Sequence, residues 1–158
     1  MFSYLKFLSK STNAHGVHSP FVYNYITQGL YAKPRLSRNK IEDVLLKSIS
    51  YFGYENIRID DDSLRAKLET HLIKLPNNTS PLDAIVLKDF KFETVLELIV
   101  AKKIHNDSLV LIQDLQGSQV EWEKTIAHPK ITVSLDSFSV GILFIRHEQV
   151  KQHFIIRI

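Results

Sequence analysis

The sequence of 158 residues contains no cysteine. This absence excludes disulfides, thiolate nucleophiles and zinc sites with sulfur ligands, and it fits a reducing compartment, so we expect a cytoplasmic protein. No apolar run approaches the roughly 20 residues that a membrane-spanning helix needs, so we expect no transmembrane segment. The first ten residues lack a continuous apolar centre and a small-residue cleavage site, so they do not predict a signal peptide.

Acidic residues are missing from the first quarter of the chain. Residues 1–40 carry six Lys or Arg and no Asp or Glu, whereas residues 41–158 carry fourteen basic and seventeen acidic residues. The formal net charge of +3 therefore combines +6 in the first part with −3 in the second. This asymmetry predicts that an anionic partner would bind near the N-terminus.

The length and the 44% content of hydrophobic residues are sufficient for one core. We expect one compact unit in which a basic helical segment, residues 1–36, precedes an α/β region, residues 37–158. Apolar spacing and capping signals predict helices over residues 2–10, 20–31 and 37–52. Ser19 and Pro20 mark the start of the second helix, and Gly53 marks the end of the third.

The remainder of the chain alternates between strand and helix patterns. Strands are expected over residues 56–59, 83–87 and 108–112, and helices over residues 63–74, 92–103 and 120–127. This alternation predicts a parallel sheet with crossover helices. Two further β-rich runs, 131–135 and 140–145, predict an antiparallel hairpin that closes the sheet. The polar segment 76–81 has proline at both ends and predicts an interior loop.

Several motifs resemble a family of small bacterial methyltransferase-like proteins. They are His15-Gly16-Val17-His18-Ser19-Pro20-Phe21-Val22, His105-Asn106-Asp107-Ser108, Asp114, residues 128–133, Asp136-Ser137-Phe138, Gly141, residues 146–149 and His153-Phe154. The resemblance implies the Rossmann-like fold of class I methyltransferases, which use S-adenosylmethionine. For this chain it implies a reduced sheet of about five strands, in order 1-4-5-7-6 by the family's strand numbering. That sheet is mostly parallel, has a C-terminal antiparallel hairpin and is preceded by helices.

The cofactor-binding half departs from the pattern that the resemblance implies. In that pattern the first strand ends in a glycine-rich loop, because the backbone must approach the cofactor closely. Asp60, Asp61 and Asp62 occupy this position here. About two dozen residues separate the first strand from the next, where the family has two further strand–helix units. The cofactor site is therefore expected to be degenerate.

Two strand ends differ as well. Lys88 stands where the resemblance implies an aspartate, and Gln113 replaces the first of a paired Asp-Asp of which Asp114 remains. Paired carboxylates could hold a divalent cation or act as a base, and a lone Asp114 suits neither task well. We therefore expect a non-catalytic protein without a cofactor. If the site survives, its cofactor would be S-adenosylmethionine.

Three groups of residues leave alternatives open. His15 and His18 have a spacing that could suit a metal, but the sequence disfavours a helix there and offers no third ligand, so we expect no metal site. We expect the pair to anchor its segment through hydrogen bonds; a wall of a substrate pocket is the alternative, and with Asp114 the pair are the remnant catalytic candidates. Residues 60–62 could bind magnesium, but a helix cap is the simpler interpretation.

Three functions remain open on the sequence. The first is a degenerate methyltransferase-like protein that binds another macromolecule, and the second is an active methyltransferase completed by an oligomer partner. The third is an RNA-binding module that uses Lys33, Arg35 and Arg38, among six basic residues that also include Lys6, Lys10 and Lys40. Six nearby aromatic side chains either stack on bases or are simply buried: Tyr4, Phe7, Phe21, Tyr23, Tyr25 and Tyr31. Because the missing units leave residues 56–59 as an edge strand, we expect a protein partner or a homo-oligomer.

Overall fold

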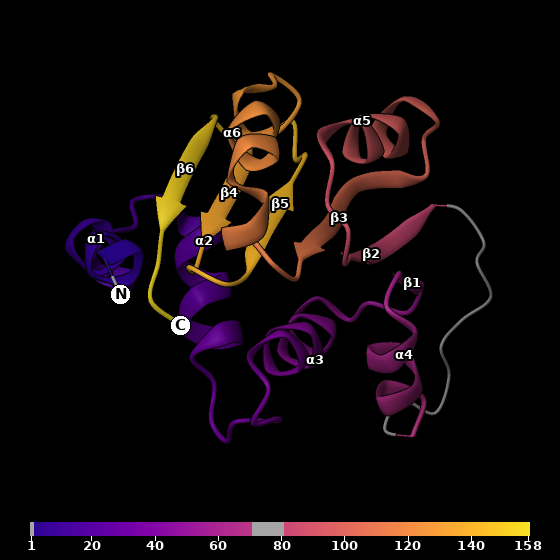
Figure 1. Ribbon diagram of the computed structural model, residues 1–158, viewed down its shortest axis with the longest axis horizontal. Coiled ribbons are helices and arrows are strands. Elements are labelled where there is room, and N and C mark those ends of the chain that lie inside the picture. The colour runs from indigo at the N-terminus through magenta and orange to yellow at the C-terminus, as the bar shows by residue number, and fades with distance from the viewer. Residues whose placement is uncertain (1, 71–80) are drawn as a thin grey trace.

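The computed structural model describes residues 2–70 and 81–158, which form a single mixed sheet with helices on both faces (Figure 1). The α-helices are α1 (Phe2–Lys10), α2 (Pro20–Asn24), α3 (Lys40–Phe52), α4 (Asp62–Glu69), α5 (Phe92–Val100) and α6 (Gln119–Ala127). Three shorter helical segments are η1 (Ala14–Gly16), η2 (Tyr25–Leu30) and η3 (Gln116–Ser118). None of the helices described is long and apolar enough to cross a membrane.

The sheet has six strands in the order β1-β2-β3-β5-β4-β6. These are β1 (Ile57–Ile59), β2 (Leu82–Leu87), β3 (Ile104–Ile112), β4 (Val133–Asp136), β5 (Gly141–Phe144) and β6 (Gln152–Ile155). The first three strands are parallel, β5 runs antiparallel to both β3 and β4, and β6 is parallel to β4. The α/β class, the order of the first five strands and the closing hairpin are confirmed, whereas the predicted number of strands is too low by one.

The unpredicted strand β6 lies at the outer edge of the sheet, beside β4. It is short and incompletely buried, so its sequence lacks the strong apolar signal of the central strands. The N-terminal segment extends this edge: the Thr12 amide donates to the Ile155 carbonyl at 2.8 Å, and Thr12 forms a parallel bridge with Ile156. The start of the chain therefore covers part of the β6 edge, at the far end of the sheet from β1 (Figure 1).

Helices on the two faces enclose two apolar cores. α2, η2, α3 and α4 share the first core, and α5 and α6 share the second (Figure 1). In β2, Ala84 and Val86 face the first core while Ile85 and Leu87 face the second. Strands that are covered on both faces read as continuous apolar runs, which is why β2 and the second half of β3 are recognisable in the sequence.

Most differences in helix bounds follow from local chemistry. α3 begins later than predicted because the Asn39 side chain accepts hydrogen bonds from the Ile41 and Glu42 amides and caps the helix there. α5 ends earlier than predicted, shortly before Lys102, whose backbone is left-handed with φ 52°. α4 ends at Glu69, so the last part of the predicted helix 63–74, like residues 76–80 of the predicted loop, lies outside the described residues.

The helices that follow β1 and β2 lie on opposite faces of the sheet. α4 follows β1 and packs in the first core, whereas α5 follows β2 and packs in the second. β1, β2 and β3 are neighbours in that order.

The Asp83 side chain fixes the beginning of the short edge strand β1. Its Oδ2 accepts hydrogen bonds from the Glu55 and Asn56 amides, both at 2.8 Å, and its Oδ1 lies 2.8 Å from Nε2 of His105. In the part of the chain that the structure describes, β1 pairs only with β2. Asp83 therefore holds the residues that precede β1 against β2.

Candidate functional site

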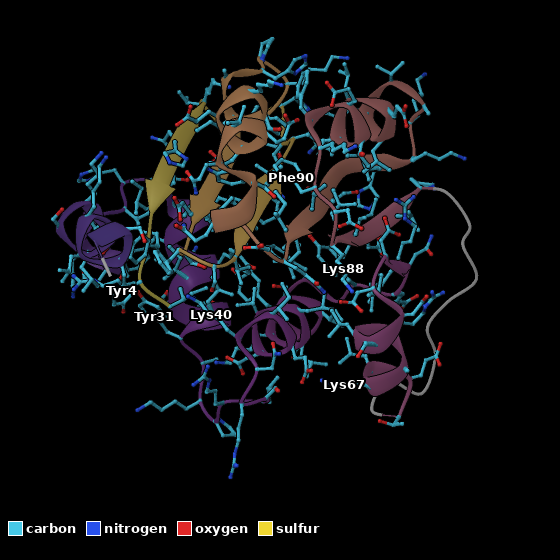
Figure 2. All side chains as sticks on the ribbon, viewed as in Figure 1. Tyr4, Tyr31, Lys40, Lys67, Lys88 and Phe90 are labelled. Carbon is cyan, nitrogen blue, oxygen red and sulfur yellow. The ribbon has the colours of Figure 1, made fainter. Side chains whose placement is uncertain are left out.

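Three polar side chains lie together just beyond the carboxyl ends of the parallel strands β1, β2 and β3. Asp61 follows β1, Lys88 follows β2 and Gln113 follows β3; together they form what we call the strand-end cluster. The Lys88 ammonium lies 3.6 Å from Asp61 Oδ2, and the Gln113 side chain hydrogen-bonds the same carboxylate. Figure 2 shows Lys88 at the end of β2, beside the β1–α4 segment. The cluster occupies the position where the resemblance implies a glycine-rich cofactor loop.

Asp61 also caps α4. Its Oδ1 accepts hydrogen bonds from the Ser63 amide at 2.9 Å and from the Leu64 amide at 3.2 Å. Burial raises the pKa of this carboxyl, but the Leu64 amide, Lys88, Gln113 and the Ser63 amide together outweigh burial and hold the pKa below its usual range. Asp61 is therefore an ionised group whose acceptors are already engaged.

The other two aspartates of this loop have separate partners. Asp60 forms a two-point ion pair with Arg58, with both N–O distances at 2.9 Å, and Asp62 pairs with Arg65 in the first turn of α4. Within residues 2–70 and 81–158, no three side chains with His, Cys, Asp or Glu donors converge on a common point. The predicted capping role of this loop is thus confirmed, and it belongs to Asp61.

Asp114 supports a turn and lies outside the strand-end cluster. Its side chain is exposed, and its Oδ1 accepts a hydrogen bond from the Gly117 amide at 3.1 Å at the start of η3. The carboxylate therefore stabilises the connection between β3 and α6. Among the residues that the structure describes, no second carboxylate pairs with Asp114, as a cation site held by paired carboxylates would require.

His15 and His18 are both exposed, and neither ring makes a hydrogen bond within the described parts of the chain. The prediction that they anchor their segment through hydrogen bonds is therefore wrong. The buried side chains of Ala14 and Val17 anchor it instead. Ser19 adds polar contacts, because its hydroxyl caps α2 at Val22 and donates to Gln149 Oε1 at 3.2 Å.

Several of the motifs that carry the family resemblance meet at the opposite ends of the strands, near the beginning of β3 and the end of β5. Arg146 lies over the Phe21 ring at 4.4 Å and forms ion pairs with Asp107 at 2.6 Å and with Glu148 at 2.5 Å. Asn106 bonds the same Glu148 carboxylate. Since β3 begins and β5 ends there, these contacts lie away from the strand-end cluster. The motifs are thus explained in part by packing and ion pairing.

The predicted RNA-contacting residues lie on the loop between η2 and α3. Lys33, Arg35 and Arg38 are all exposed. The proposed stacking aromatics are less accessible: Tyr25 is fully buried and its hydroxyl lies 2.6 Å from the Ser48 hydroxyl, and Phe21 packs beneath Arg146. The remaining four divide between packing and exposure: Tyr4 and Phe7 contact the Phe138 ring, and Tyr4, Tyr23 and Tyr31 are exposed.

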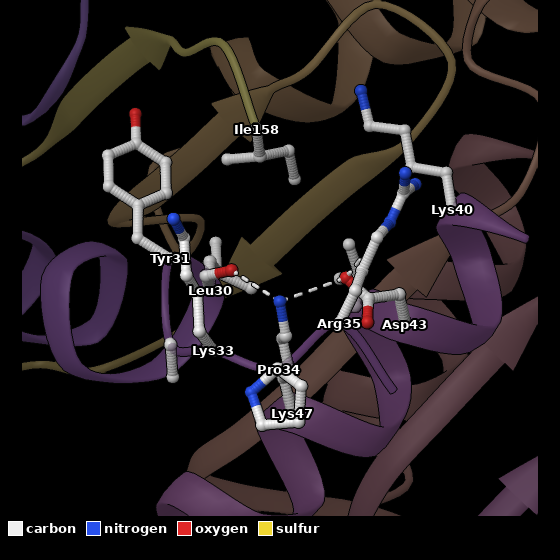
Figure 3. Close-up of a pocket in the computed structure, with 11 residues that line it drawn as sticks. Leu30, Tyr31, Lys33, Pro34, Arg35, Lys40, Asp43, Lys47 and Ile158 are labelled. Atoms are coloured by element: carbon white, nitrogen blue, oxygen red, sulfur yellow. Dashed lines mark hydrogen bonds and ion pairs between the residues drawn. The ribbon is translucent and has the colours of Figure 1, made fainter. Parts of the chain in front are cut away.

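A cavity of about 410 Å³ opens beneath this loop, and we call it the loop pocket (Figure 3). Its apolar wall consists of Leu30, Tyr31, Ala32, Pro34, Val44 and Ile158, and its charged groups are Lys33, Arg35, Lys40, Asp43 and Lys47. The pocket therefore joins the basic segment 1–36 to the first turns of α3. The basic segment shares its core with the α/β region, since Val22, Ile26 and Leu30 are buried in it.

One buried ion pair forms the base of the loop pocket. The Lys47 ammonium lies 3.0 Å from Asp43 Oδ2 and donates to the Leu30 carbonyl at 3.0 Å, as the dashed lines in Figure 3 mark. Asp43 Oδ1 accepts from the Leu36 amide at 2.6 Å and from the Ser37 amide at 3.3 Å. Asp43 thus neutralises Lys47 and fixes the loop that carries Lys33 and Arg35.

Lys40 brings a second ammonium group to the pocket. Its Nζ donates to the Ser137 carbonyl at 2.7 Å, and Arg35 lies close to it (Figure 3). Burial lowers the pKa of Lys40, and the Arg35 charge lowers it further, while Asp136 opposes both effects. Asp43 and Lys47 were not predicted as site residues, whereas Lys40 was expected only as one of the basic residues that could contact RNA. Their three- and four-residue spacings place all three on one helix face.

Comparisons of the chain with protein-family models, with curated protein sequences and with solved structures found no match in any of the three. Similarity to a characterised protein therefore assigns no family and no activity to this chain. The strand order, the strand-end cluster and the loop pocket are the features of the molecule that indicate a function.

Proposed function

We propose that this protein is a shortened, non-catalytic relative of S-adenosylmethionine-dependent methyltransferases that acts by binding another macromolecule. The strand-end cluster is the observation that carries this proposal. Its Asp61 carboxylate is ionised and its acceptors are engaged by two backbone amides, Lys88 and Gln113. A cofactor that needs close backbone approach at this position would have to displace these contacts, and its own carboxylate would meet that of Asp61.

The topology supports the idea that the chain is shortened. α4 lies on the opposite face of the sheet from α5. If the β2–α5–β3 connection has the usual right hand, a right-handed connection through the face of α4 would lead away from β2, to a strand beyond β1. The next described strand is instead β2. This arrangement is what the loss of two strand–helix units after α4 would produce. The strand order of the rest agrees with the order that the resemblance implies.

Titration with S-adenosylmethionine and S-adenosylhomocysteine tests this proposal, and no binding is expected for the folded protein. Micromolar binding would favour the alternative of an active methyltransferase whose site is completed by an oligomer partner.

The edge strand motivates a partner. The outer edge of β1 has no neighbouring strand within the described residues, and exposed backbone groups of this kind are usually paired or covered. We infer that β1 pairs with a second copy or with another protein. Light scattering is expected to give a mass above the 18.3 kDa of one chain. The mass of a single chain at working concentration would exclude a homo-oligomer.

A second candidate function is RNA binding through the loop between η2 and α3. The observation that favours it is the exposure of three cationic side chains, Lys33, Arg35 and Arg38, on one loop. The affinity for RNA is then expected to fall steeply as the salt concentration rises. The triple variant Lys33→Gln/Arg35→Gln/Arg38→Gln should make this dependence on salt concentration weaker. Undetectable or salt-insensitive binding would contradict this function.

A further inference from the structure

We propose that the loop pocket binds a phosphate monoester on a molecule of about nucleotide size. The phosphate would lie at Arg35 and Lys40, with the rest of the ligand extending across the pocket toward Lys33 and Tyr31, which lie on the other side (Figure 3). This inference does not depend on the proposed loss of methyltransferase activity, because the loop pocket and the strand-end cluster share no residue.

The charges of the pocket are unbalanced in favour of an anion. Four cationic groups line it, and Asp43 is its one acidic residue. The Asp43 carboxylate is already engaged by Lys47 and by two loop amides, and its contact with Arg35 is a looser one of 3.8 Å. Lys47 is therefore neutralised by Asp43. Arg35 keeps only its looser contact with the same carboxylate, Lys40 feels a partial offset from Asp136, and Lys33 makes no ion pair within the described residues.

The free donors suit a phosphate oxyanion. Arg35 has a side chain that is 62% exposed, so its guanidinium can offer paired N–H donors to two oxygen atoms. Lys33 lies on the same loop, and its ammonium has no partner within residues 2–70 and 81–158. Lys40 has one donor on the Ser137 carbonyl, which leaves two others for a ligand.

An anion would also relieve a local repulsion. Arg35 and Lys40 lie close enough for the Arg35 charge to disfavour the charged form of Lys40. Two cations held together in a partly buried site are stabilised when a dianion lies between them. The loop is already fixed by the hydrogen bonds from the Leu36 and Ser37 amides to Asp43, so binding would not need to order it first.

The remaining wall fits an apolar or planar group. Tyr31, Pro34, Val44 and Ile158 line the pocket, and the Tyr31 hydroxyl is held by the Arg157 carbonyl at 2.7 Å. The volume of about 410 Å³ lies within the range of about 300–1,000 Å³ that is typical of small-molecule sites. Apolar walls with a few converging polar groups are the usual composition of such sites.

Calorimetric titration with inorganic phosphate and with adenosine monophosphate tests the proposal at physiological salt. Both are expected to bind, with the nucleotide binding more tightly. The double variant Lys33→Gln/Arg35→Gln should weaken both by about tenfold or more. The matched control is Lys103→Gln/Lys130→Gln, which removes two exposed charges elsewhere and should bind as the wild type does. Undetectable binding, or equal weakening in both variants, would overturn the proposal.

A second comparison identifies the source of the phosphate and guards against a folding artefact. A short oligoribonucleotide with a 5′-phosphate should compete with adenosine monophosphate if the phosphate is a nucleic-acid end, and should not compete if the site takes a free nucleotide. Competition by the same oligonucleotide without its 5′-phosphate would mean that the surface binds the internal phosphates of the RNA backbone, and would overturn the proposal. Circular dichroism should show that both double variants unfold at the wild-type temperature, because all four side chains are exposed.

Discussion

Lys47 holds a charged group in a largely buried position. Its side chain is 8% exposed and that of Asp43 is 10% exposed, and their charged atoms lie 3.0 Å apart. In this buried position the pair stabilises the fold mainly because each charge is balanced by the other; either charge alone would be poorly solvated. The same pair fixes the base of the loop pocket, so its loss would affect both stability and the pocket.

Replacement of Lys47 by methionine should therefore lower the free energy of unfolding by about 3 kcal/mol. Asp43 would keep its two amide hydrogen bonds, but its buried charge would be left with only a loose cationic contact, to Arg35. Urea denaturation measures this change. Lys67→Met is the control, since Lys67 is 62% exposed and pairs with Glu42 at 3.4 Å, and it should cost less than about 1 kcal/mol. Equal costs for the two variants would contradict this account of the pair.

Asp61 should make the stability depend on pH. Its folded pKa lies below the unfolded value of about 3.9, so its ionised form stabilises the protein above that pH. The contribution is lost as pH falls through the folded pKa. Asp61→Asn should therefore destabilise the protein at pH 7 and flatten its loss of stability below about pH 4.

Urea titrations from pH 7 down to pH 3 measure that dependence. Glu123→Gln is a suitable control because this side chain is exposed and has no partner among the described residues. An unchanged pH profile in Asp61→Asn would mean that the strand-end cluster contributes little to folding.

At the scale of the element, α3 ends at a glycine for a conformational reason. Gly53 has a φ of 67° and lies at the left-handed cap, while no atom outside Gly53 and its two chain neighbours lies within 4 Å of the position that a Cβ would take. Gly53→Ala should therefore cost about 1 kcal/mol through backbone strain alone. Gly53→Asn should cost less, since asparagine tolerates this conformation. Thermal unfolding of the two variants measures which one is less stable. Equal destabilisation by alanine and asparagine would indicate that the backbone at residue 53 leaves the left-handed conformation in the variants.

The edge strand β1 depends on the hydrogen bonds of the Asp83 carboxylate, which we call the Asp83 clamp: they join it to the Glu55 and Asn56 amides and to His105. Asp83→Ala removes the acceptor of two backbone amides and the partner of His105, and should cost about 2 kcal/mol. Hydrogen exchange should become faster at the Glu55 amide, while amides in β5 are affected less. Asp89→Ala, at an exposed position, is the control and should leave exchange unchanged. Unchanged exchange in the Asp83 variant would show that the clamp is dispensable.

At the scale of the whole molecule, the pattern of apolar residues predicted most of the architecture. β2 and β3 are covered on both faces and were recognisable as apolar runs, and Ser19 and Gly53 marked helix ends correctly. β6 was missed because its burial is incomplete and its pairing with β4 is a contact between distant segments. Periodicity within a short segment cannot indicate such a partner.

The candidate site was predictable only in part. The basic loop was visible as charge, but the buried Lys47–Asp43 pair and the Lys40 contact with the Ser137 carbonyl arise from the packing of α3 against the rest of the chain. The hydrogen bond of Gln113 to Asp61 likewise joins two strand ends that only the sheet brings together. Sequence spacing identifies such residues one at a time, whereas the fold determines which of them meet.

Calorimetric titration of the folded protein with S-adenosylhomocysteine, with the wild type compared with Asp61→Ala/Lys88→Ala, shows whether the cofactor site has been lost. We expect no binding heat from the wild type at millimolar ligand, because the strand-end cluster occupies the position of the cofactor loop. A cooperative thermal transition in the same sample shows that the protein is folded. Micromolar binding by the wild type that the double variant weakens would place a working cofactor site at the strand-end cluster and would exclude the proposed non-catalytic role.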